Sequence, residues 1–114
     1  METDKRQKRV ASAIQEAMSR LLIQEFPNAS NGLITVTGVE MTADLKTARV
    51  FLSLYGALDR EAVWPLLEKR KGFLRKALAS LVKLKYNPSL IFSLDRTAEL
   101  EERLDRLIEL AKKR

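Results

Sequence analysis

Apolar side chains recur at steps of three and four residues in the first part of the chain, from about Asp4 to Phe26. The positions that share this spacing are Val10, Ile14, Met18, Leu21 and Leu22. Such spacing places them on one face of an α-helix, so it predicts a first helix. The proline, the two asparagines and the glycine within residues 27–32 are typical of a loop.

Two stretches rich in β-branched and alternating apolar residues follow this loop. The first runs from Leu33 to Met41, and its apolar positions change phase across Gly38. An extra residue in one strand shifts the phase in this way, so we predict a strand with a bulge or bend at Gly38. A turn at residues 42–46 leads into the alternating residues Thr47 to Tyr55, which predict a second strand and a hairpin.

A helical pattern of apolar residues continues to about Leu84. Positions before Gly72 are out of phase with those after it, and glycine inside a helix costs about 1 kcal/mol relative to alanine. We therefore predict two helices joined by a kink near Gly72. Asp59 is a candidate cap for the first of them, because its carboxylate can accept free backbone N–H groups. Pro88 ends the helical region, since proline lacks a backbone donor.

The last part of the chain predicts a third strand at Ser89 to Leu94 and a final helix from Thr97 to Arg114, with Thr97 as its cap and a stripe of leucines along one side. The resulting order is helix, strand, strand, two helices, strand, helix. This order predicts an α+β two-layer sandwich, in which helices lie on one face of a three-stranded sheet. The other face of the sheet is expected to stay partly exposed.

The composition narrows the function classes. With 114 residues, of which 46% are hydrophobic, the chain suits one domain over residues 1–114. It has neither an apolar run near the roughly 18 residues that cross a bilayer nor a start like a signal peptide, so we expect a cytoplasmic protein without membrane contact. The sequence has no cysteine and no histidine. Without these residues and without a nucleotide-binding or covalent-catalysis motif, we expect no enzyme activity, metal or cofactor.

The net charge of +6 is concentrated in one segment. Residues 60–86 hold eight basic and two acidic side chains, which accounts for the whole excess, and a second basic group opens the first helix. Basic clusters of this kind favour phosphate-bearing partners. The candidate RNA-binding residues are Lys5, Arg6, Lys8, Arg9, Lys69, Arg70, Lys71, Gly72, Arg75, Lys76, Lys83 and Lys85. Glycine at the kink would let a nucleic-acid backbone approach closely.

Other interpretations of the same features stay open at this point. The basic group that opens the first helix, Lys5, Arg6, Lys8 and Arg9, suits a frayed, solvated helix end as well as it suits phosphate binding. Phe51 and Tyr55 share the strand face opposite the apolar one, where they could stack on bases. The favoured interpretation is that the leucines of the final helix cover that face instead. Trp64 is expected to be a packing anchor. A protein-interaction module and a generic nucleic-acid-binding module are the alternatives to an RNA-binding factor, and a metal-dependent hydrolase is a remote one.

An ordered set of short motifs runs across about the whole chain. Its residues are Arg6, Arg9 and Val10, then Ile34 to Val39, then Asp44, Leu45 and Ala48, then Gly72 to Arg75, and finally Pro88, Leu90, Phe92 and Asp95. No single motif is specific, but in this order and spacing the set resembles the ribosome-binding factor A family.

The resemblance implies a type II KH-like fold and a monomer that binds the small ribosomal subunit and its rRNA late in assembly. It also implies help in processing the rRNA ends, support of growth in the cold, and release that involves a ribosome-associated GTPase or an initiation factor. Family members carry an Ala-x-Gly kink between the two central helices, and the matching positions here are Arg70, Lys71 and Gly72. The resemblance places the RNA surface on the first helix and the kinked pair.

Overall fold

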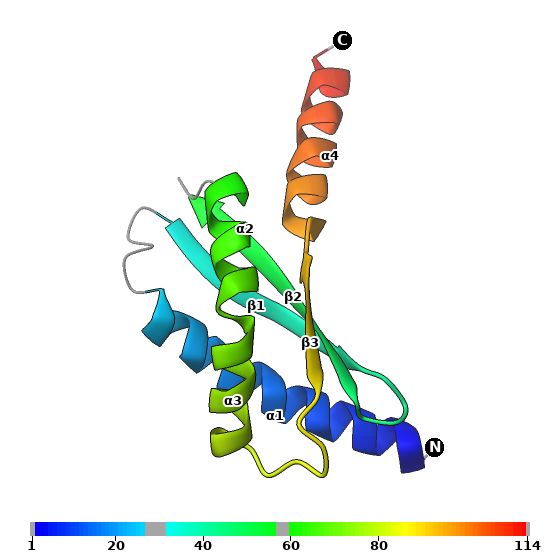
Figure 1. The fold of residues 1–114 in the computed structure, drawn as a ribbon. Coiled ribbons are helices and arrows are strands. Elements are labelled where there is room, and N and C mark those ends of the chain that lie inside the picture. Colours follow the sequence, from blue (N-terminus) through cyan, green and yellow to red (C-terminus); the bar gives the residue numbers. More distant parts are fainter. Residues whose placement is uncertain (1, 27–31, 57–59, 114) are drawn as a thin grey trace.

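The computed structural model describes residues 2–26, 32–56 and 60–113. Helices and strands follow the predicted order (Figure 1). They are α1 (Glu2–Glu25), β1 (Gly32–Met41), β2 (Thr47–Gly56), α2 (Arg60–Lys69), α3 (Lys71–Leu81), β3 (Ser89–Leu94) and α4 (Thr97–Lys112). The predicted cap Asp59 lies outside the described residues.

The three strands form one mixed sheet in the order β1-β2-β3. β1 and β2 are an antiparallel hairpin, and β3 runs parallel to β2 after the chain has crossed over through α2 and α3. α1 packs against β1 and α3, and α3 also reaches β3. The fully buried Ala48, Val50 and Leu52 of β2 lie at the centre of the core. The α+β two-layer architecture is therefore as predicted.

The phase change in β1 is a β-bulge, as the sequence predicted. Val36 pairs with Leu52 and Gly38 pairs with Phe51, so one residue of β1, Thr37, is left over between the two pairs. Because of this extra residue, Met41 returns to the core face that Val36 occupies, and both side chains are buried. The bulge thus keeps both halves of β1 in one hydrophobic layer.

The break between α2 and α3 is at Arg70, two positions before the predicted kink at Gly72. Helical hydrogen bonding continues through it, because the Arg70 N–H donates to the Leu66 carbonyl at 3.0 Å and its carbonyl accepts from the Leu74 N–H at 2.9 Å. The two helices consequently follow one another nearly in line (Figure 1). This arrangement is a short interruption and not a sharp bend.

Two predicted helix boundaries are wrong. α3 ends at Leu81 and not at Leu84, because Val82 adopts an extended conformation that lets Val82 and Leu84 pack against the core. At α4, Arg96 occupies the cap position that was assigned to Thr97, and its side chain makes no capping bond. The Thr97 N–H instead donates to the Asp95 carboxylate at 2.9 Å. Asp95 thus satisfies a backbone donor at the start of the helix.

The leucine stripe of α4 does not cover the sheet, contrary to expectation. Figure 1 shows α4 extending away from the end of β3, and every described side chain from Leu100 onward is exposed. Leu104 and Leu107 are 57% and 58% exposed. Two residues separate α4 from β3, and the backbone N–H of Thr97 at the start of α4 is bonded to Asp95.

Two leucines offer a matched test of this packing. Leu78→Ala in α3 removes a fully buried side chain and should lower the free energy of unfolding by about 2–5 kcal/mol. Leu104→Ala in α4 removes an exposed one and should change it by less than about 0.5 kcal/mol. Urea denaturation followed by circular dichroism measures both values, and equal losses would show that α4 is packed.

Asp95 should make stability depend on pH in the acid range. Hydrogen bonds from Thr37 (hydroxyl) and Thr97 (hydroxyl and N–H) lower the pKa of Asp95 to about 2 from its ordinary value of 3.8. Because folding lowers this pKa, the carboxylate stabilises the fold above the unfolded-state value and loses that effect as the pH falls toward about 2. Asp95→Asn should flatten the fall of the urea midpoint over this pH window. An unchanged acid profile in the variant would contradict the assignment.

Candidate nucleic-acid interface

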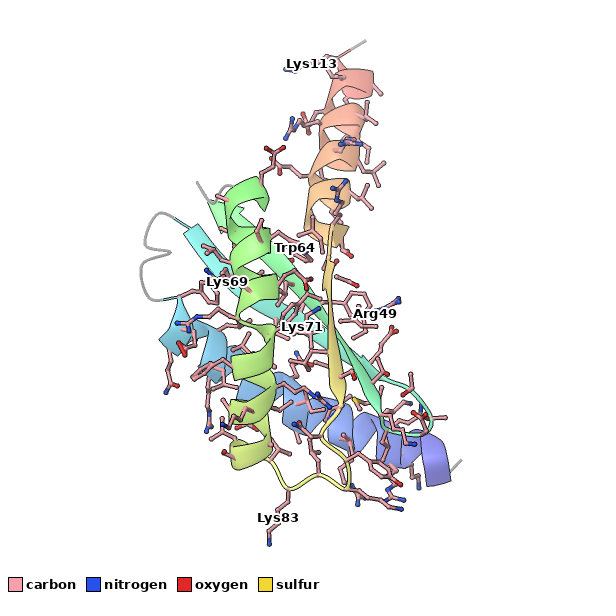
Figure 2. All side chains as sticks on the ribbon, in the orientation of Figure 1. Arg49, Trp64, Lys69, Lys71, Lys83 and Lys113 are labelled. Atoms are coloured by element: carbon pink, nitrogen blue, oxygen red, sulfur yellow. The ribbon has the colours of Figure 1, made fainter. Side chains whose placement is uncertain are left out.

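The structure separates the predicted basic residues into two groups at different places. The first, called the junction group, is Lys69, Arg70, Lys71, Arg75 and Lys76, on the end of α2 and the first half of α3. The second lies near the other end of α3, where the chain leaves the helix for β3. Figure 2 shows Lys69 and Lys71 beside the junction and Lys83 at the opposite end of the helix.

Part of the junction group is already engaged within the protein. The Arg70 guanidinium lies 3.5 Å from the Glu25 carboxylate of α1 and 5.4 Å from the centre of the Phe73 ring. The Lys71 ammonium lies 2.6 Å from Glu68 and 5.5 Å from the centre of the Phe92 ring. Arg70 and Lys71 therefore link α1, α2, α3 and the sheet. The carboxylates of Glu25 and Glu68 partly neutralise their charge.

Arg75 has a structural role that the charge count did not reveal. Its Nε donates to the Pro88 carbonyl at 2.9 Å, and one terminal nitrogen donates to the Asn87 carbonyl at 2.8 Å. The guanidinium thus fixes the loop before β3 to α3. Lys69 and Lys76 are exposed, and neither forms an ion pair within the described ranges. They are the accessible charges of the junction group.

Gly72 is exposed on the first turn of α3 and is not needed there for packing. A Cβ added at this position would meet no atom within 4 Å. The space above the glycine is open, as the hypothesis of a close nucleic-acid approach requires. The fold itself gives no reason for glycine at this site.

Three segments converge to form the second group, which we call the basic end. They are the first turns of α1, the turn between β1 and β2, and the loop between α3 and β3, which meet at one end of the molecule (Figure 1). The Gln7 side chain donates to the Met41 carbonyl at 3.0 Å, and the Ser89 N–H donates to the Lys46 carbonyl at 2.8 Å. These bonds fix α1 and the loop to the hairpin.

Two adjoining hollows lie at the basic end. The larger, of about 470 Å³, is lined by Arg6, Ala43, Asp44, Leu45, Lys46, Lys85 and Tyr86. The smaller, of about 200 Å³, is lined by Arg6, Arg9, Val10, Leu45, Lys83, Leu84, Lys85, Tyr86 and Pro88. Together these linings hold five basic side chains and one carboxylate. Such a surface favours an anionic ligand.

Four predicted residues are therefore brought together here, namely Arg6, Arg9, Lys83 and Lys85. Lys5 and Lys8 are exposed on the same turns of α1 but line neither hollow. Sequence reasoning missed Lys46, because it belongs to a nearly neutral segment, and Tyr86, because it follows a helical pattern. The adjacent Lys85-Tyr86 pair was the available signal, since an aromatic residue next to a cation is common in single-strand binding.

The turn that carries Lys46 has an unusual backbone. Leu45 has a φ of 62°, in the left-handed region that a leucine rarely adopts, while its side chain is buried. The Asp44 carboxylate accepts the Thr42 hydroxyl at 2.6 Å and the Lys46 N–H at 3.0 Å, and these bonds lower the pKa of Asp44. The turn is thus held in one conformation by an ionised side chain.

Neither a metal-binding cluster nor a membrane span occurs in the part of the chain that the structure describes. No group of three acidic residues among them is arranged to hold a metal ion. None of the described helices combines the length and the apolar character that crossing a bilayer requires.

Comparison with known proteins identifies the family. The family model for ribosome-binding factor A matches residues 6–108. The ribosome-binding factor A of Coxiella burnetii is 38% identical over 109 residues, which cover 96% of this chain and 92% of the relative. Similar structures include the crystal structure of ribosome-binding factor A from Thermus thermophilus, with a TM-score of 0.67 and 22% identity over 80% of this chain and 98% of that one.

A second solved structure has the same fold. It is a homology model of the Thermus thermophilus factor fitted into a cryo-EM map of a 30S–RbfA complex, with a TM-score of 0.64 and 22% identity over 75% of this chain and 90% of that one. The shared fold agrees with the type II KH-like architecture that the sequence implied. Since the family model spans both basic groups and all three strands, this chain belongs to the ribosome-binding factor A family.

Proposed function

We propose that this protein binds the free small ribosomal subunit and its rRNA late in assembly, in the cytoplasm, as a single-domain monomer without enzymatic activity. It would aid maturation of the rRNA ends and growth in the cold, and a ribosome-associated GTPase or an initiation factor would take part in its release. The observation that carries the proposal is the convergence of five basic side chains at one end of a chain that belongs to this family. The related Thermus thermophilus factor, placed in a map of a 30S complex, supports the same partner.

The proposed mechanism is binding without bond making. Basic side chains would neutralise rRNA phosphates, while the rigid arrangement of α1, the hairpin turn and the loop before β3 would select one rRNA shape. A ligand shifts an equilibrium between two rRNA conformations only by its different affinity for them. Both the junction group and the basic end would contribute, with Lys69, Lys76, Lys83 and Lys85 as the exposed phosphate contacts.

The exposed leucines of α4 favour a second candidate, a module that docks on another protein. Leu100, Leu104 and Leu107 form an apolar strip in which each side chain is more than half exposed. Salt distinguishes the two candidates, because phosphate binding weakens steeply as salt rises, whereas an apolar contact hardly responds.

Cosedimentation with small subunits, large subunits and whole ribosomes over a range of salt concentrations tests the proposal. The protein should bind free small subunits alone, and its affinity should fall as salt rises. Lys83→Ala with Lys85→Ala should weaken binding and reduce the slope of log affinity against log salt by about 2, one for each lost phosphate contact. Equal binding to all particles, or none, would refute the proposed function.

The matched control removes the same charge elsewhere. Arg103→Ala with Lys112→Ala deletes two exposed basic side chains of α4, far along the chain from both basic groups. This double variant should keep the salt slope of the wild type. A loss as large as that of the Lys83 and Lys85 variant would mean that only net charge matters.

Gly72→Ala separates folding from binding at the helix junction. Alanine fits the open space and favours helix, so the free energy of unfolding should rise by up to about 1 kcal/mol. If the rRNA backbone passes close to this glycine, small-subunit binding should weaken although the protein is more stable. Urea denaturation and cosedimentation of the same preparation measure both effects, and unchanged binding would remove Gly72 from the interface.

A further inference from the structure

Tyr86 is an aromatic side chain that lies outside the hydrophobic core. It lies in the loop between α3 and β3, is 41% exposed, and is not among the hydrophobic side chains that form or flank the core. Phe92 and Trp64, by contrast, pack into or against that core. Packing in the core therefore does not account for an aromatic residue at this position.

Basic side chains from three segments of the chain lie near the Tyr86 ring or line the same hollow. The Lys46 and Lys85 ammonium groups each lie 5.5 Å from the centre of the Tyr86 ring. Arg6 lines the same hollow from α1. An accessible aromatic ring with basic side chains around it is the arrangement that proteins use for unpaired nucleotides, because the ring stacks on a base while the cations contact the phosphates.

The hollow also has the right size and a fixed shape. Its volume of about 470 Å³ falls in the range of sites that hold small ligands. One of its walls is the turn with the left-handed Leu45, and the Ser89 N–H fixes that turn to the start of β3. Strained backbone that a surrounding structure holds in place occurs preferentially at binding sites.

Asp44 makes the hollow less suited to a ligand that carries negative charge throughout than to one with a single phosphate. Its carboxylate lines the same hollow and would repel a ligand that is anionic throughout, such as inorganic phosphate or a sulfated polymer. A nucleotide brings one phosphate together with neutral donors, namely ribose hydroxyls and, on most bases, an amino group. A hollow with several cations and a single carboxylate therefore suits a nucleotide better.

We propose that this hollow takes one unpaired nucleotide of RNA, whose base stacks on the Tyr86 ring and whose phosphate lies among Arg6, Lys46 and Lys85. This inference rests on the proposed rRNA binding and makes it specific, because a base held in a duplex could not reach the ring. The basic end would then distinguish a single-stranded rRNA segment from a paired one, whereas the junction group would respond to phosphates alone.

Fluorescence anisotropy at low salt with the full chain tests this site. The probes are labelled single-stranded oligoadenylate, the same oligomer paired with oligouridylate, and an abasic ribose-phosphate oligomer of equal length. The wild type should bind oligoadenylate about tenfold more tightly than the abasic oligomer, since one stacked base contributes a factor of that order. The paired form offers phosphates but no free base, so Tyr86→Ala should leave its affinity unchanged.

Substitutions test whether the preference for oligoadenylate over the abasic oligomer depends on the Tyr86 ring. Tyr86→Ala should bind oligoadenylate and the abasic oligomer equally, whereas Tyr86→Phe should keep the preference. Lys46→Ala should weaken both complexes by a similar factor, because it removes a phosphate contact. Circular dichroism checks that each variant is folded, which the exposure of both side chains leads us to expect.

Phe73→Ala is the matched control, since Phe73 is also exposed and lies near a cation, Arg70, but lines neither hollow. Loss of the base preference in this variant, or its survival in Tyr86→Ala, would overturn the assignment to Tyr86. A wild type without any preference, or without binding to oligoadenylate, would overturn the nucleotide site while small-subunit cosedimentation still held. Absence of that cosedimentation would instead overturn the proposed function.

Discussion

The pairing of β3 with β2 determines where the basic side chains lie. The two strands are parallel and Ser89 pairs with Thr47, so β3 must begin at the end of the sheet where β2 begins. The chain reaches that point through α2 and α3, as a parallel pair requires a crossover. The loop that carries Lys83, Lys85 and Tyr86 is thereby placed beside the hairpin turn that carries Lys46. This pairing brings the loop and the hairpin turn together, and α1 adds Arg6 and Arg9 through its own contact with β1.

Much of the architecture could be predicted from the sequence, because elements with one buried face have apolar residues at regular intervals. The alternation along β2 and the phase change in β1 identified the strands, the core face and the bulge, since each extended residue faces either the core or the solvent. The ends of α3 and the position of α4 were not accessible in this way. Leu84 fits a helical stripe, yet it packs against the core from a loop. α4 has an amphipathic pattern, yet the leucines of its apolar side are exposed.

The candidate site shows the same division. The sequence revealed which segments are basic, but it could not show that Arg75 is committed to carbonyls of a loop or that Arg70 and Lys71 face carboxylates. It also could not show that Lys46, from a nearly neutral segment, completes a basic hollow. Charge counted along a chain gives the sum of paired and unpaired groups. Only the fold separates cations that hold the protein together from those that remain for a ligand.

The convergence at the basic end also has a consequence for the order of events during synthesis. Of the residues that meet there, Arg6 is synthesised first, Lys46 follows, and Lys85 and the first residue of β3 come last. Contacts between residues so far apart in sequence form late in folding, because a long stretch of chain must first be closed. The hollow consequently does not exist in a nascent chain that lacks β3. Only a protein that has completed its sheet can present this surface, so the RNA affinity proposed for this end would distinguish a folded molecule from an incomplete one.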